Sequence, residues 1–169
     1  GAFDGRFVYF VPLIKGVVVR HDTQGDFDDA NSWEAFDAKP VGIGMNVGAV
    51  FDGHWLYFCA YGHPSMVRYD TRKPFADASS WEQYDAANTS GIDTGGFDGG
   101  FFDGRYVTFC PWTRTAPPGG SGYHCNYLRF DTTRSFDDPS AWTGYDASAT
   151  DGLVSLGYNA GAFDGGSFY

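Results

Sequence analysis

Apolar and aromatic residues along the chain fall in short runs separated by Asp, Gly and Thr, and this pattern occurs three times. Each copy has a Gly-rich run ending in Phe-Asp-Gly, an aromatic run after it, a run ending in Arg-aromatic-Asp-Thr, and a run opening with Trp. Runs that are apolar at nearly every position are typical of strands covered on both faces. None has the capped 3.6-residue period of a helix. We therefore predict four β-strands per repeat.

We name the expected strands A to D in chain order within each repeat. Strand A ends at Phe-Asp-Gly and strand B is the aromatic run that follows. Asp-Gly between them is the sequence of a tight hairpin turn, because Gly tolerates positive φ. The expected strands C and D are 17–22 and 33–37 in the first repeat, 66–70 and 81–85 in the second, and 127–131 and 142–146 in the third.

Four antiparallel strands, the third ending in aromatic-Asp and the fourth beginning at Trp, resemble the blades of Kelch-type β-propellers. The resemblance covers the whole chain. Kelch blades carry a Gly-Gly pair at the end of strand B, where this chain has 11–12, 60–61 and 111–112, none of them Gly-Gly. The resemblance implies an all-β fold, a propeller with three four-stranded antiparallel blades. It implies little about activity, because such propellers include enzymes, adaptors and binding modules.

Three blades do not close a ring, because propellers have about 4–8 blades. The first repeat has almost no strand A, and its opening pentapeptide 1–5 recurs unchanged at 161–165. We expect a homodimer that completes a six-bladed ring, in which 158–163 of one copy is the inner strand of the other copy's first blade. The alternative is a piece of a longer natural chain. The single half-ring domain, 1–169, divides into blades near 1–46, 47–96 and 97–157, with 158–169 donated to a neighbouring blade.

Length differences between the repeats all fall at the end of the expected blades that carries the B–C and D–A connections. The third B–C connection is ten residues longer than the other two. In repeat proteins the variable end is often the binding face. The candidate ligand-binding residues there are Trp112, Arg114, Tyr123 and His124 in the third B–C loop, Tyr61 and His63 in the second, and Asn46, Asp98 and Asn159 at the starts of the A strands.

Competing structural explanations exist for several of these residues. Trp112 can pack the inserted loop against the edge of the blade, since Trp is usually largely buried. A Gly lies two residues after each of Asn46, Asp98 and Asn159, so turn geometry can also account for them.

Aromatic rings and an Arg on a loop suit sugar or peptide recognition, because rings stack on apolar surfaces while a guanidinium makes directional hydrogen bonds. We expect a non-enzymatic module that binds a carbohydrate or another small polar ligand. One alternative is a glycoside-active hydrolase that uses two of Asp93, Asp98 and Asp151 near the ring axis as acid and base. Another is a protein-interaction scaffold. The sequence has no nucleophile elbow, and no catalytic residue is assigned.

Composition limits the classes of binding partner that we expect. With 21 acidic residues against 11 basic ones and a net charge of −10, the chain is not expected to bind nucleic acid. No apolar run approaches the roughly 20 residues that a membrane span needs, so no membrane association is expected. No cofactor or metal is expected either. His63, His124 and Cys125 form only a weak metal set, and the Asp-rich stretches 26–29 and 136–138 favour solvated turns over calcium loops.

An Arg recurs in strand C of every repeat, at positions 20, 68 and 129. Each shares a strand face with the Asp two residues later. Because a residue common to all repeats usually serves the fold, we predict a structural Arg–carboxylate pair within each repeat.

Three cysteines are present. Cys59 and Cys110 occupy the same strand B position in two repeats, as small buried hydrophobes do. Cys125 lies across the hairpin from Cys110, so a disulfide is an open alternative. An odd number of cysteines does not identify the cellular compartment, and we favour a secreted or periplasmic location.

Overall fold

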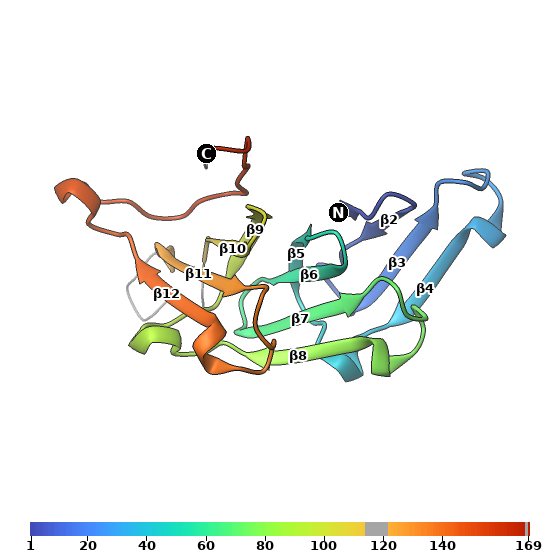
Figure 1. Ribbon diagram of the computed structural model, residues 1–169, viewed down its shortest axis with the longest axis horizontal. Coiled ribbons are helices and arrows are strands. Elements are labelled where there is room, and N and C mark those ends of the chain that lie inside the picture. The colour runs from blue at the N-terminus through green and yellow to red at the C-terminus, as the bar shows by residue number, and fades with distance from the viewer. Residues whose placement is uncertain (114–121, 168) are drawn as a thin grey trace.

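The computed structural model describes residues 1–113, 122–167 and 169. They form three separate four-stranded antiparallel sheets, each with its strands in chain order (Figure 1). Within these residues the only helical elements are 3₁₀ turns of three residues. The prediction of an all-β chain with four antiparallel strands per repeat is confirmed. No helix in the described part of the chain is long and apolar enough to cross a membrane.

The strand bounds follow the sequence repeats. Sheet 1 contains β1 (Ala2–Phe3), β2 (Phe7–Phe10), β3 (Val17–Asp22) and β4 (Trp33–Asp37). Sheet 2 contains β5 (Asn46–Phe51), β6 (Trp55–Ala60), β7 (Ser65–Asp70) and β8 (Trp81–Asp85). Sheet 3 contains β9 (Phe97–Phe102), β10 (Tyr106–Pro111), β11 (Asn126–Asp131) and β12 (Trp142–Asp146).

The Asp-Gly turns between the first two strands of each sheet have one common construction. In sheet 3, Asp103 Oδ1 accepts hydrogen bonds from the backbone N–H groups of Arg105 (2.8 Å) and Tyr106 (2.6 Å). Gly104 has a φ of +100°, which an L side chain rarely adopts. The carboxylate therefore satisfies the turn's backbone donors, and the Asp residues of this motif are structural, as predicted.

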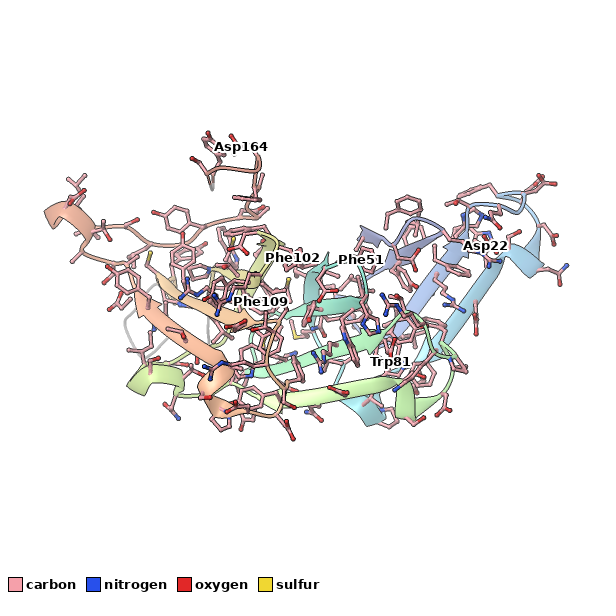
Figure 2. The ribbon with its side chains drawn as sticks, in the orientation of Figure 1. Asp22, Phe51, Trp81, Phe102, Phe109 and Asp164 are labelled. Atoms are coloured by element: carbon pink, nitrogen blue, oxygen red, sulfur yellow. The ribbon has the colours of Figure 1, made fainter. Side chains whose placement is uncertain are left out.

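Layers of aromatic rings pack consecutive sheets against each other. Between sheets 1 and 2, Tyr9 meets Tyr69 at a ring-centroid distance of 6.0 Å. Between sheets 2 and 3, Tyr57 meets Phe130 at 5.8 Å. Figure 2 shows Trp81 and Phe109 within these layers, where both side chains are buried. Burying several rings at each junction supplies the main apolar stabilisation between sheets.

The first strands of sheets 2 and 3 lie side by side near the centre of Figure 1, whereas β4, β8 and β12 lie at the periphery. Gly48 in β5 and Gly99 in β9 occupy equivalent positions, and both have a φ of +79°. A Cβ built on Gly48 would lie 3.2 Å from the Cα of Gly99. Glycine therefore allows the two backbones to approach closely.

The row of inner strands continues beyond β9. Ala160 donates a backbone hydrogen bond to Asp98 (2.9 Å) and has a left-handed φ of +60°, like Gly48 and Gly99. A Cβ built on Gly99 would lie 3.0 Å from the Cα of Ala160. The segment 158–163 thus lies against β9 as β9 lies against β5.

Residues 161–167 and 169 repeat contacts found in residues 1–9. The Tyr169 hydroxyl donates to Asp164 (3.1 Å), as the Tyr9 hydroxyl donates to Asp4 (2.7 Å). The backbones of Ala162 and Tyr169 exchange two hydrogen bonds of 3.0 Å, which corresponds to the Ala2–Tyr9 pairing in sheet 1. The described residues therefore form three four-stranded sheets, and after the third sheet they repeat the Ala–Tyr pairing and the Asp–Tyr contact that begin sheet 1.

Candidate functional site

Two half-exposed aromatic residues flank the inserted loop at the end of sheet 3 that carries the B–C connection. Trp112 follows β10 and Tyr123 precedes β11, and their rings meet edge to face at 5.0 Å. An isolated bridge between Thr113 and Tyr123 holds the base of the loop. Tyr123 is 45% exposed and packs over Gly157. The structure therefore brings Trp112 and Tyr123 together at the surface.

A carboxylate–amide pair lies beside these rings. Asn159 Nδ2 donates to Asp98 Oδ2 at 2.8 Å. Burial raises the pKa of the Asp98 carboxyl above its ordinary value. Backbone bonds from Trp112 to Gly96 (2.9 Å) and from Tyr158 to Pro111 (2.8 Å) hold the two segments and the rings in one surface. These bonds join the segments that carry four candidate residues, Trp112, Tyr123, Asp98 and Asn159, which we call the rim.

The two candidate histidines have structural positions in the second and third hairpins. His63 Nε2 contacts the Met45 carbonyl (3.0 Å), and its Nδ1 accepts from the Ser65 N–H (3.3 Å). His124 makes the same two contacts, with the Gly96 carbonyl (3.1 Å) and the Asn126 N–H (3.3 Å). Since Nδ1 accepts, Nε2 carries the donated proton, and each ring ties a hairpin to the inner strand. These contacts indicate a structural role for both histidines and not a role in ligand binding.

The remaining candidates are less central. Asn46 is buried, and its side chain bonds the Cys59 carbonyl (3.2 Å) and the Gly44 N–H (3.1 Å), as turn geometry requires. Tyr61 is half-buried and donates its backbone N–H to Met45 (2.9 Å). Arg114 lies outside the described residues.

The cysteines and carboxylates show no metal-binding arrangement in the described part of the chain, where no group of three metal-ligating side chains occurs. Cys59, Cys110 and Cys125 are buried free thiols, so the alternative of a Cys110–Cys125 disulfide is not realised. Burial raises the pKa of Cys110 to about 11. In the Asp-rich turns, the side chains of Asp29 and Asp138 cap 3₁₀ helices.

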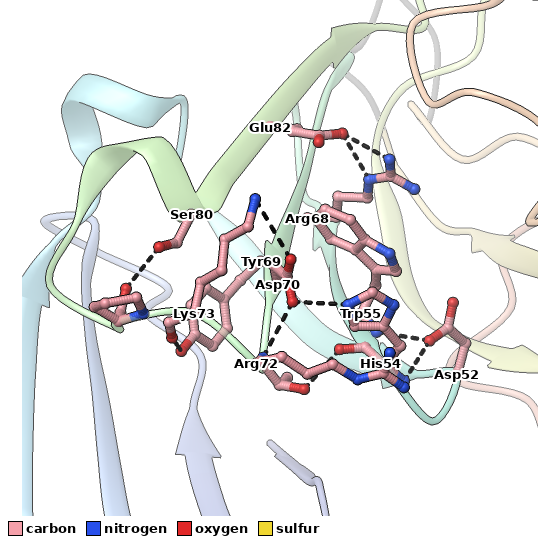
Figure 3. Close-up of polar contacts among 12 residues, drawn as sticks. Asp52, His54, Trp55, Arg68, Tyr69, Asp70, Arg72, Lys73, Ser80 and Glu82 are labelled. Atoms are coloured by element: carbon pink, nitrogen blue, oxygen red, sulfur yellow. Dashed lines mark hydrogen bonds and ion pairs between the residues drawn. The ribbon is translucent and has the colours of Figure 1, made fainter.

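The predicted Arg–carboxylate pair exists in two sheets, but with another partner than expected. Arg20 bonds Glu34 on the neighbouring strand at 2.7 Å. Arg68 likewise bonds Glu82 on the neighbouring strand at 2.6 Å (Figure 3). The Asp that follows two residues after the strand C Arg instead binds a residue of the first turn of its sheet. In sheet 3, for example, Arg105 binds Asp131 at 2.7 Å. Side chains on adjacent strands lie directly opposite each other, which explains the preference for the Glu.

Sheet 3 departs from this pattern and carries a hollow that sequence reasoning missed. Arg129 lies opposite Thr143, so the carboxylate of the other sheets is absent. The hollow measures about 570 Å³ on the open face of the sheet. The signal was available in the sequence, because Thr143 replaces the Glu of the other repeats. The side chains that line it include Phe101, Cys110, Tyr127, Arg129, Tyr145 and Tyr158.

Comparisons with protein-family models, with curated proteins and with solved structures find no match to this chain.

Proposed function

We propose that the chain is a non-enzymatic binding module for a carbohydrate or another small polar ligand, and that the ligand contacts the rim formed by Trp112, Tyr123, Asp98 and Asn159. The supporting observations are the edge-to-face pair of half-exposed Trp112 and exposed Tyr123, and the hydrogen-bonded Asp98–Asn159 pair on the adjoining segments. Ring faces suit the apolar faces of a sugar, while a carboxylate and an amide suit its hydroxyls.

Binding is favoured over glycoside hydrolysis because of the partner of Asp98. Hydrolysis by two carboxylates requires an acid and a base that flank the same bond. The Asp98 carboxylate bonds an amide from Asn159, and Asp151 lies in a turn on the exposed D–A connection. A carboxylate held by an amide is suited to orienting a ligand hydroxyl.

We further propose that the sheets are blades of a β-propeller. The support is the regular step along the inner strands, from Gly48 to Gly99 and from Gly99 to Ala160. Each step places the next inner strand in the same close contact with the preceding one. A repeated step of this kind is the geometry by which blades are arranged around an axis.

The same step supports a six-bladed ring made of two copies. The inner strand of sheet 1 has two residues, whereas β5 and β9 have six each. In the ring, 158–163 of one copy would serve as the inner strand of the other copy's first blade, where it replaces residues 1–3. The β2 strand of that other copy would then take the place beside Ala162 that Tyr169 holds in the single chain. Because 161–163 and 1–3 have the same sequence, Gly-Ala-Phe, the exchange preserves side-chain contacts.

A glycan array, followed by calorimetric titration of any sugar retained, tests the binding proposal. Trp112→Ala and Asp98→Asn should each weaken binding at least about tenfold, since each removes a central contact. Gln24→Ala, an exposed change at the opposite end of sheet 1, is the control and should leave affinity unchanged. Retention of affinity in both rim variants would contradict the proposed site, and turnover of a chromogenic glycoside would favour the hydrolase.

A further inference from the structure

A guanidinium sandwich recurs at both junctions between sheets. The Arg20 guanidinium carbon lies 4.0 Å from the Phe7 ring centroid and 4.4 Å from that of Phe75, which belongs to the next sheet. At the second junction, Arg68 lies 3.8 Å from the Trp55 ring (Figure 3) and 4.4 Å from that of Phe136. The Phe of the following repeat therefore covers the Arg of the preceding one.

A second ring contact recurs at the same junctions. Trp81 of sheet 2 stacks on Phe36 of sheet 1 at 5.2 Å. Trp142 of sheet 3 stacks on Tyr84 of sheet 2 at 4.7 Å, with the rings 5° from parallel. Each following sheet thus contributes one Phe and one Trp to the sheet before it.

Sheet 3 presents the receiving half of this arrangement. Arg129 lies 4.2 Å from the Tyr106 ring centroid on one side, and its other side faces the 570 Å³ hollow. Tyr145, the counterpart of Phe36 and Tyr84, is 63% exposed. Thr108 stands where the other sheets have Tyr9 and Tyr57, which leaves additional room in the hollow.

Sheet 1 presents the contributing half. Its Phe27 is 72% exposed, although its counterparts Phe75 and Phe136 are only 1% and 2% exposed. Trp33, the counterpart of Trp81, has no preceding sheet to pack on within the described chain. It keeps the contact inside its own sheet, with Phe10 at 5.5 Å, which corresponds to that of Trp81 with Phe58 at 5.4 Å.

Charge makes the two halves complementary. Among the described residues no carboxylate pairs with Arg129, because Thr143 replaces the expected Glu. Phe27 is flanked by exposed Asp26 and Asp28, whereas Phe75 is flanked by Pro and Ala. Arg129 therefore has a positive charge without a carboxylate partner, and the Phe27 loop has two negative charges beside its ring. The two surfaces are complementary in charge.

On the basis of the proposed ring, we propose that Phe27 and Trp33 of a second copy of this chain dock on Arg129 and Tyr145. Phe27 completes the guanidinium sandwich over Arg129, and Trp33 stacks on Tyr145. Both copies contribute both halves, so two such junctions close the ring with two-fold symmetry. The junction between copies then has the same construction as each of the two junctions between sheets inside the chain.

Complementation between two variants tests the pairing. Phe27→Ala and Arg129→Ala each weaken both junctions of a homodimer, so each should raise the dimer Kd about 100-fold, or about tenfold per junction. An equimolar mixture allows a heterodimer in which one junction is intact and the other has lost both residues. That heterodimer should be about tenfold tighter than either variant homodimer, as measured by native mass spectrometry with a mass tag on one variant.

The outcomes separate this inference from the ring proposal. A wild-type dimer whose Kd is unchanged by both variants would overturn the Phe27–Arg129 pairing and leave the ring intact. A wild-type chain that stays monomeric would overturn the ring and the pairing together. A heterodimer no tighter than the variant homodimers would show that Phe27 and Arg129 act separately and would also overturn the pairing. Circular dichroism of both variants checks that the sheets are preserved.

Discussion

Gly99 and Ala160 are in backbone contact, since a Cβ added to Gly99 would lie 3.0 Å from the Cα of Ala160. The two residues are 61 positions apart and belong to equivalent points of successive repeats. Their contact fixes the segment after sheet 3 against β9 and gives that segment the position of a further inner strand.

Gly99→Ala should therefore destabilise the protein by about 2–4 kcal/mol. About 1–2 kcal/mol comes from placing a side chain at positive φ, and overpacking against Ala160 adds to it. Gly104→Ala is the control, because Gly104 also has a positive φ but has nothing within 4 Å of the added Cβ. If urea unfolding gave the same loss of unfolding free energy for both variants, the inner strands would not be closely packed.

Two equivalent phenylalanines should differ sharply on truncation. Phe75→Ala removes a ring buried between sheets 1 and 2 and should cost about 3–5 kcal/mol of unfolding free energy. Phe27→Ala removes the exposed counterpart and should change the stability of the dissociated chain by less than about 0.5 kcal/mol. Urea unfolding at a dilution where the chain is monomeric provides the comparison. A large loss for Phe27→Ala there would mean that its role lies inside sheet 1.

Acid should weaken the fold through Asp131. The Arg105 guanidinium and the Thr133 hydroxyl hold the pKa of its carboxyl well below the usual range. A lowered folded-state pKa contributes stability above the ordinary Asp value of about 3.9, and this contribution is lost as pH falls through the folded-state pKa. Asp131→Asn should therefore show a smaller loss of stability between about pH 5 and pH 2 than the wild type.

Asp98 provides the control of opposite sign. Burial raises its pKa, so the folded state binds this proton more tightly and is favoured by acid at this site. Asp98→Asn should make the acid-induced loss of stability steeper than in the wild type. If both variants shifted the profile in the same direction, the assignment of these two pKa changes would be wrong.

Removal of residues 158–169 should abolish the proposed dimer. This deletion uncovers the inner edge of β9 and removes the strand that the other copy requires, so monomer or aggregate is expected. Deletion of 164–169 alone retains 158–163 and should leave the dimer in place. Analytical ultracentrifugation of both deletions makes the comparison, and a stable dimer of the longer deletion would refute strand donation.

The strands were predictable because each repeat contains its own turn and strand-start residues. Asp-Gly sets the first turn, and a Trp opens the fourth strand in all three copies. Local signals of this kind act within a few residues, so sequence alone placed strands such as β3 (Val17–Asp22) and β4 (Trp33–Asp37) correctly.

The site was harder to predict because its contacts join distant segments. The pairing of Asp98 with Asn159 and the backbone role of His124 depend on how inner strands pack, which no local pattern encodes. The sequence predicts a partner for Arg68 on its own strand, whereas cross-strand register places Glu82 opposite it. Register between strands follows from the whole sheet, so residue spacing along one strand could not reveal it.

The mass of the intact chain in solution tests the central claim most directly. Light scattering at micromolar concentration should give twice the 18.5 kDa of one chain, because in the proposed ring two copies would cover the open faces of sheets 1 and 3. A single species of 18.5 kDa over the same range would contradict the six-bladed ring and the docking of Phe27 on Arg129.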